Sequence, residues 1–341
     1  MRFLALLCAL ALAGCAEPLP EDVTQLTYAS PYPPSHPFSM ADQRWMDWVE
    51  EESDGRIDIR PIWSGTLLSS DMSMEELRHG VADIGLITPI YARGGSHLLR
   101  IQTGFYSGAD SIETQVGVYR CLESRIPQIA EELEGLKVMA VQGGLLPGIL
   151  TRGRPVKSLD DIRGLRLRAP TELLPVLGNL GADPVNLPMA DVYSALAKGV
   201  IDGVVAPPDT FRALHLAEIA DYYFALRVPR GAYPARAIGE ARWNSLEPWQ
   251  RELLERSIPV WEAALTDEIE ASEQAGRDAA EGKITYFEPT DEEQRLFDDL
   301  YLRDGEANAR ALARFDIDGL TAFETARASL VERDQVKCGG N

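Results

Sequence analysis

The sequence is poor in positive charge, in cysteine and in long apolar runs. Its 341 residues include 33 Lys and Arg against 53 Asp and Glu, a formal net charge of −20. A nucleic-acid-binding protein depends on cationic side chains that displace phosphate counterions, so this balance argues against such a partner. Four cysteines are too few for a disulfide scaffold. The remaining composition, 45% hydrophobic and 25% charged, is that of a globular protein long enough for two domains.

The familiar catalytic and metal-binding motifs are also missing. The four histidines, at 36, 79, 97 and 215, lack ligand spacing and none lies near a cysteine, so we expect no metal site made of protein ligands. There is no G-x-S-x-G elbow, no P-loop and no G-x-G-x-x-G after a predicted strand. These absences favour a binding protein over an enzyme without excluding an enzyme, and we predict no catalytic residue.

One apolar run stands out, at the N-terminus. Arg2 precedes apolar residues 3–12, which have the length of the hydrophobic part of an export signal and are too short to span a bilayer. The following L-A-G-C, ending at Cys15, resembles the lipobox of bacterial lipoproteins, whose cysteine carries the lipid. We therefore predict a lipoprotein signal peptide over 1–14 and a lipidated tether over 15–25, with the lipid as the sole membrane attachment. An ordinary signal peptide with a chance cysteine is the alternative.

Cys121 and Cys338 are the two cysteines that lie beyond the predicted signal peptide and tether. In an oxidising compartment the two can pair, whereas one buried thiol and one exposed tail thiol is an equally weighted alternative. The sequence leaves their pairing open.

Strand and helix patterns alternate in the first part of the chain. Strand patterns lie at 26–29, 56–62 and 81–87, with helical patterns between them. This succession is typical of a parallel, doubly wound α/β sheet. A helix–Gly–strand phrase at 76–85 returns at 195–203, so we expect two related lobes.

The ends of the predicted strands indicate where a ligand binds. In open α/β sheets ligands lie at the carboxyl ends of strands, so residues 87–89 and 206–209 should face a shared cleft. Further along, apolar residues spaced by three and four predict a long helix over about 248–282. At 1.5 Å per residue this helix is about 50 Å long, enough to span both lobes.

The segment 154–203 carries a family resemblance. It contains R-P-V-K-S-L-D-D-I-R-G-L-R-L-R-A-P and then L-G-A-D-P-V-N-L-P-M-A-D-V-Y-S-A-L-A-K-G-V-I-D-G. This order of motifs resembles the solute-binding proteins of tripartite ATP-independent periplasmic (TRAP) transporters, the DctP-like family, although Asp191 stands where relatives usually have Glu. An earlier D-G-R-I-D-I strand and an H-G-V-A-D-I-G turn also look like family features, so the resemblance covers most of the mature chain.

The resemblance implies a two-lobed α/β periplasmic-binding-protein fold with a central cleft and a long helix bridging both lobes. We predict lobe 1 over 26–148 and approximately 236–258, and lobe 2 over 149–235 and approximately 259–335. The implied function is capture of a small organic carboxylate by hinge closure in the periplasm and its delivery to a TRAP membrane permease, by a monomer that needs no cofactor. A periplasmic enzyme acting on a small carboxylate and a ligand-binding accessory of a sensor kinase remain alternatives.

Arg168 receives the main role from this resemblance. Alternation in 165–168 places its side chain and that of Arg166 on one face of a strand. Such arginines are ordinarily surface or salt-bridged residues, but the last one corresponds to the arginine that grips the ligand carboxylate in the family. A guanidinium matches a carboxylate with two charge-assisted hydrogen bonds, whereas the negative net charge repels an anion at long range, so binding depends on this local contact. Arg166 is assigned to the surface.

Two departures from the family pattern bear on the ligand. Val205-Ala206 stand where many relatives have Glu-Asn, and 143–148 reads G-G-L-L-P-G where relatives often bring a second polar or basic contact. We therefore expect a more apolar pocket than one for a polyhydroxylated sugar acid. Core or turn packing is the alternative for each of the other predicted ligand contacts, which are Tyr32, Thr88, Tyr91, Met189 and Asp209.

Overall fold

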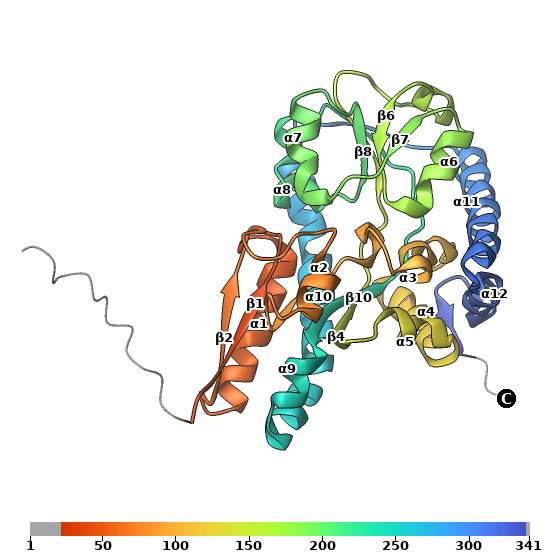
Figure 1. Cartoon of the computed structure of the whole chain (residues 1–341). Helices are drawn as coiled ribbons and strands as arrows, with labels where there is room; N and C mark the ends of the chain where they lie inside the picture. The colour runs from red at the N-terminus through yellow and green to blue at the C-terminus, as the bar shows by residue number, and fades with distance from the viewer. Residues whose placement is uncertain (1–21, 339–341) are drawn as a thin grey trace, which may run out of the picture.

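The computed structural model describes residues 22–338. The predicted signal peptide, Cys15 and the first part of the predicted tether lie outside these residues. The described chain forms two separate sheets, each with its own helices, and a small two-stranded ribbon (Figure 1).

Five strands form the first sheet, in the order β2 (Ile57–Ile62), β1 (Thr24–Ala29), β3 (Ile84–Leu86), β10 (Tyr233–Gly239) and β4 (Leu136–Gln142). Six strands form the second, in the order β11 (Thr285–Phe287), β9 (Tyr222–Phe224), β5 (Gly148–Thr151), β8 (Gly203–Ala206), β6 (Arg166–Arg168) and β7 (Asp183–Val185). The ribbon pairs β12 (Leu330–Glu332) with β13 (Gln335–Val336).

The α-helices are α1 (Pro37–Glu52), α2 (Ser73–Arg78), α3 (His97–Ile101), α4 (Ile112–Arg125), α5 (Pro127–Glu132), α6 (Leu174–Asn179), α7 (Val192–Ala197), α8 (Thr210–Ala213), α9 (Glu240–Ser245), α10 (Pro248–Ala280), α11 (Asp291–Ala311) and α12 (Gly319–Ser329). Short 3₁₀ turns are η1 (Pro89–Tyr91), η2 (Gln102–Phe105), η3 (Leu159–Ile162), η4 (Thr171–Leu173), η5 (Met189–Asp191), η6 (Leu216–Glu218) and η7 (Leu312–Phe315).

Both sheets are mixed rather than purely parallel. β1 runs parallel to β2 and β3 as predicted, but β10 is antiparallel to β3 and β4, and β5 is antiparallel to β8 and β9. The prediction of a parallel arrangement is confirmed for β1, β2 and β3, the strands on which it rested. β5 and β10 were not part of that prediction. β4 leads directly into β5 of the other sheet and β9 leads directly back into β10, so the two crossing segments run in opposite directions.

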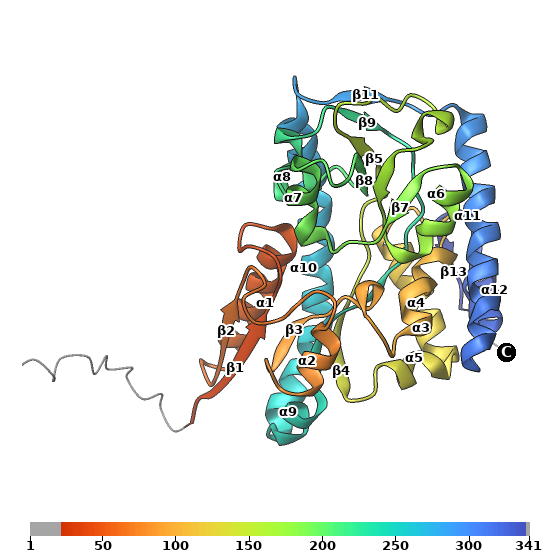
Figure 2. The same cartoon turned by 45° about the horizontal axis from the view of Figure 1, so that its top comes forward.

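α10 connects the two lobes. It contacts α1 and β4 in the first lobe and α8 in the second, which confirms the predicted bridging helix. Figure 2 shows it running from beside α9 up to the second sheet. Against α1 the contact is aromatic, because the rings of Trp45 and Trp261 stack with centroids 3.6 Å apart.

The C-terminal tail differs from the predicted division into lobes. α11 lies beside both lobes (Figures 1 and 2), but α12 packs against α4 and η2 of the first lobe. A disulfide between Cys121 of α4 and Cys338 fixes the end of the tail to the same lobe, with Cα atoms 5.2 Å apart. Assigning the whole of 259–335 to lobe 2 is therefore wrong for the part from α12 onward. The same disulfide answers the question that the sequence left open.

A buried polar cluster lies where α1, β10 and α10 meet. Asp42 and Arg236 are fully buried and form an ion pair, with Arg236 Nε donating to Asp42 Oδ1 at 2.7 Å. Trp261 Nε1 donates to the same oxygen at 2.9 Å, and the Tyr28 hydroxyl donates to Asp42 Oδ2. Gln142 Oε1 accepts from Arg236 Nη1 at 3.2 Å. One carboxylate thus receives donors from β1, β10 and α10.

Candidate functional site

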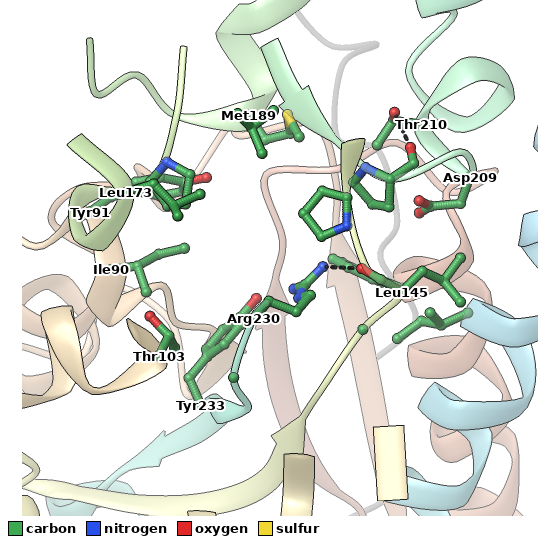
Figure 3. A pocket seen from close by; sticks show the side chains of 18 of the residues that line it. Ile90, Tyr91, Thr103, Leu145, Leu173, Met189, Asp209, Thr210, Arg230 and Tyr233 are labelled. Carbon is green, nitrogen blue, oxygen red and sulfur yellow. Dashed lines mark hydrogen bonds between the residues drawn. The ribbon is translucent and has the colours of Figure 1, made fainter. Parts of the chain in front are cut away.

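A cavity of about 110 Å³ lies where the chain crosses between the two sheets. The crossing segments 143–147 and 229–233 contribute to its wall, as do α10 and the residues that follow β6 and β8. Much of the lining is apolar, and Figure 3 shows its side chains converging on one space from both lobes. Its apolar members include Phe38, Ile90, Leu145, Leu173, Met189, Val205, Leu214 and Ile269.

Five of the six predicted ligand contacts line this cavity, namely Tyr32, Tyr91, Arg168, Met189 and Asp209. Thr88 is the exception. It is buried beside the cavity wall, where its hydroxyl donates to the carbonyl oxygen of Ser70 and its backbone N–H donates to Ser73 Oγ at 3.2 Å. Thr88 is therefore not brought into the cavity with the other five, and its hydroxyl bonds to the loop that precedes α2.

Arg168 ends strand β6 with its side chain buried, at 2% exposure. β6 lies between β7 and β8, so the backbone is held on both sides. Nε donates to the carbonyl oxygen of Leu187 at 2.7 Å, Nη2 donates to the Tyr91 hydroxyl, and the guanidinium carbon lies 5.5 Å from the centre of the Tyr91 ring. Arg166 is exposed and lies 3.7 Å from Asp183, which confirms its predicted surface position. Only the second arginine of the strand is therefore available to the cavity.

The first-lobe wall of the cavity is aromatic and uncharged. The ring of Tyr32 stacks on His36 with centroids 4.1 Å apart and meets Phe38 edge-on. Burial, followed by the positive charge of Arg236, lowers the pKa of His36 to about 3, so this imidazole is neutral at physiological pH. Burial also raises the pKa of Tyr32 well above its ordinary value. The wall therefore offers ring faces and neutral hydroxyl groups to a ligand.

Two buried carboxyl groups also line the cavity. Glu172 follows β6 in η4 and Asp209 precedes α8; each has one oxygen, Oε2 and Oδ1 respectively, without a hydrogen-bond partner in the described part of the chain. Burial raises the pKa of Glu172 to about 7, opposed by the charges of Arg168 and Arg230. Burial raises the pKa of Asp209 to about 7 as well, opposed first by the charge of Arg230. Both groups thus change charge near neutral pH.

Arg230 and Glu172 are cavity residues that the sequence analysis missed. Glu172 comes four residues after the predicted site arginine, beyond the carboxyl end of the same strand. Because ligands of open α/β sheets lie at the carboxyl ends of strands, this position was a signal that could have identified it. Arg230 lies in P-R-G at 229–231, a segment without strand or helix pattern, and its position depends on how the chain crosses between lobes. No sequence signal pointed to it.

Residues 22–338 contain no cluster of three metal-ligating side chains placed to hold a metal ion. Within the same range, every helix is too short or too polar to cross a membrane.

Comparison with known proteins identifies a family. The family model described as bacterial extracellular solute-binding protein, family 7 (DctP), matches residues 28–300. A solute-binding protein of Chromohalobacter salexigens is 24% identical over 265 residues, which cover 73% of this chain and 75% of the relative.

Solved structures share the fold. A TRAP solute-binding protein from Rhodoferax ferrireducens, in complex with copurified benzoate, superposes with a TM-score of 0.82 at 22% identity, covering 90% of this chain and 97% of that one. A TRAP periplasmic solute-binding protein from Bordetella bronchiseptica, with bound (R)- and (S)-mandelate, gives a TM-score of 0.78 at 21% identity, covering 89% and 98%. These similarities confirm the predicted two-lobed binding-protein fold.

Proposed function

Because the chain belongs to family 7 of the bacterial extracellular solute-binding proteins, we propose that it captures a small carboxylate with an apolar, ring-sized body in the periplasm and delivers it to a TRAP permease. The observation that carries this proposal is Arg168, a buried arginine at the carboxyl end of a strand that faces a largely apolar cavity. A guanidinium in such a setting binds a carboxylate strongly, because both hydrogen bonds are charge-assisted and water is scarce.

The size of the cavity supports a small ligand. At about 110 Å³ it is comparable with an engineered cavity of about 150 Å³ that holds benzene in another protein. Benzoate and mandelate, found in the two structural neighbours, are carboxylates with one aromatic ring. The aromatic wall of Tyr32 and Phe38 suits a flat apolar body in the same way.

Hinge closure is the proposed mechanism. Tyr32 and Tyr91 come from the first lobe, whereas Arg168 and Met189 come from the second, so a ligand touches both sets only when the lobes are closed. This difference in contact shifts the population towards the closed state. The five-stranded and the six-stranded sheet form the cores of the proposed moving bodies, and the crossing segments form the hinge.

A ligand screen tests the proposal. We expect benzoate, phenylacetate and related ring acids to raise the melting temperature of the purified protein, by an amount that follows RT ln(1 + [L]/Kd). The matched amides, which lack the carboxylate, should give no shift. Equal shifts by acids and amides, or none from the whole acid panel, would contradict the proposed ligand class.

We further propose that the protein binds without turnover, as a monomer anchored through a lipid on Cys15. Mass spectrometry of the acid after incubation with the protein should recover it unchanged, whereas a product would indicate the periplasmic enzyme that the sequence left as an alternative.

Affinity for a carboxylate should depend on pH. Glu172 and Asp209 have pKa values raised to about 7, so both are mostly neutral at pH 6 and mostly ionised at pH 8. The ligand carboxylate stays ionised throughout, and its repulsion by the two carboxylates grows as pH rises, although Arg168 and Arg230 offset part of it. We expect Kd for benzoate to rise on the order of tenfold between pH 6 and pH 8.

Isothermal titration calorimetry at several pH values measures this dependence. The Glu172→Gln and Asp209→Asn variants should each flatten it, because an amide does not titrate. Glu273, whose negative charge raises the pKa of Asp209, offers a remote variant with a smaller effect. An affinity that is constant from pH 6 to pH 8 would refute the expected coupling.

A further inference from the structure

Arg230 places a second guanidinium in the cavity. The side chain is half-buried, and Figure 3 shows it projecting into the space between the segment with Ile90 and Tyr91 and the segment with Asp209. Within residues 22–338 it makes one hydrogen bond, from Nη1 to the carbonyl oxygen of Leu145 at 3.3 Å. A guanidinium has five N–H donors, so most of its capacity is left for a ligand.

Gly144 makes room for this guanidinium. A Cβ atom at Gly144 would lie 2.6 Å from Cζ and 2.6 Å from Nη1 of Arg230, which is closer than real atoms approach. The Gly144 backbone is itself fixed, because its N–H donates to Gln115 Oε1 at 2.9 Å and its carbonyl accepts from Gln115 Nε2 at 3.0 Å. Gly144, which has no side chain, therefore leaves the space that the guanidinium of Arg230 occupies.

Asp209 supplies the complementary acceptor. It is 5% exposed, it lines the same cavity, and its Oδ1 has no hydrogen-bond partner in the described chain. The charge of Arg230 is the first of the influences that oppose the effect of burial on the pKa of Asp209. Among the described residues, the one hydrogen bond of the Arg230 side chain goes to Leu145, and Oδ1 of Asp209 has none. A buried acceptor left without a donor is costly, and a bound ligand can supply the donor.

From this arrangement we infer that Arg230 and Asp209 form a second polar subsite that binds a hydroxyl group of the ligand. Arg230 donates to the hydroxyl oxygen, and the hydroxyl donates to Asp209 Oδ1. The inference rests on the proposed function and narrows it, since the solute becomes a hydroxylated carboxylate whose acid group is held by Arg168.

A hydroxyl group fits the charges of the subsite better than a second carboxylate. Asp209 lies near Glu273 of α10 as well as Arg230, and Glu172 is a further carboxyl group in the cavity wall. A dianionic ligand would bring two further negative charges next to these carboxyl groups, and the cavity has only the two arginines Arg168 and Arg230 to balance them among its described lining residues. A hydroxyl adds no charge and is both donor and acceptor, so it can bond to Arg230 and Asp209 together.

The test compares acids that differ by one hydroxyl group. The probes are benzoate with its 2-, 3- and 4-hydroxy derivatives, phenylacetate with mandelate, and the benzenedicarboxylates, each titrated by calorimetry. We expect at least one hydroxylated acid to bind the wild-type protein about 10-fold to 100-fold more tightly than its parent, as for a hydrogen bond to a charged group. Arg230→Met and Asp209→Ala should each abolish that gain, which is measured as the ratio of the affinities for the hydroxylated acid and its parent within the same variant.

Two further variants complete the design. Gly144→Ala forces the guanidinium of Arg230 out of its seat, so it should also remove the gain although it changes no polar side chain. Arg212→Met removes one exposed arginine of α8 and should leave the gain intact, which controls for net charge. Melting temperatures of all variants check folding, and Asp209→Ala keeps the test decisive if Arg230→Met fails to fold.

Each outcome decides. A gain that disappears in the subsite variants supports the inference. Three results would overturn the inference while leaving the carboxylate-binding function in place. The parent acids could bind with no gain from a hydroxyl group, or the gain could persist in both Arg230→Met and Asp209→Ala. A benzenedicarboxylate could also bind more tightly than every hydroxylated acid. If neither the parents nor the hydroxylated acids bind, the proposed function itself fails, and the inference fails with it.

Discussion

Replacing Arg168 with Met should weaken carboxylate binding by about 30-fold or more, because truncating one partner of a buried charged pair costs about 2–5 kcal/mol. Met keeps much of the apolar stem and removes the positive charge. The guanidinium is oriented before the ligand arrives, with Nε bonded to Leu187 and Nη2 to Tyr91. Little entropy is then lost on binding, which makes the contact stronger than one from a mobile surface arginine.

Arg166→Met is the matched control for this experiment. It lies on the same strand two residues earlier, carries the same charge and is exposed beside Asp183. Calorimetry with benzoate, or with the acid that the screen selects, should give an affinity within about twofold of wild type for this variant, since exposed ion pairs contribute little. A folded Arg168→Met protein that binds as tightly as Arg166→Met would refute the assignment of Arg168.

Arg168 was predictable from the sequence for two separate reasons. The alternation of L-R-L-R indicated which residues share a face of the strand, and the family motif predicted which of the two arginines lies in the cavity. Asp209 belongs to the predicted strand end at 206–209, and the structure brings both it and Met189 into the cavity. Their role in binding stays a prediction.

The position of Arg230 in the cavity could not be predicted from the sequence. The glycines at 143–144 predict the loss of a polar contact, and they carry no side chain that could provide one. The structure places the guanidinium of a residue more than eighty positions away in the freed space, so the second basic group comes from another segment. A chain reversal between lobes brings these segments together, and no local periodicity encodes that reversal.

The fold shows the same limit. Helix α10 was predictable because its apolar residues repeat every three or four positions over its length. The antiparallel direction of β5 and β10 was not, because a strand has the same side-chain alternation whichever way its neighbours run. The Cys121–Cys338 pair spans 217 residues of sequence and depends on α12 folding back onto the first lobe, so sequence alone gave no reason to prefer it.

Asp42→Ala should lower the free energy of unfolding by about 3–5 kcal/mol, the cost of breaking a buried ion pair by removing one partner. The change leaves the fully buried Arg236 guanidinium without its counter-ion. It also removes the acceptor for Trp261 and for the Tyr28 hydroxyl. Because these donors come from β10, α10 and β1, the loss loosens the contact between the first sheet and the helix that reaches the second lobe.

Urea denaturation followed by circular dichroism measures the effect, with Asp47→Ala as control. Asp47 is an exposed residue of the same helix whose carboxylate accepts only from the nearby Gln43 at 2.8 Å among the described residues, so its loss should cost less than about 0.5 kcal/mol. The double variant Asp42→Leu with Arg236→Met replaces the pair by apolar side chains and should recover much of the stability lost in Asp42→Ala. Equal stabilities of the Asp42→Ala and Asp47→Ala proteins would show that the buried pair does not hold the lobe to α10. Recovery of stability in the double variant would show that the stability lost in Asp42→Ala comes from the buried charge of Arg236 without its counter-ion.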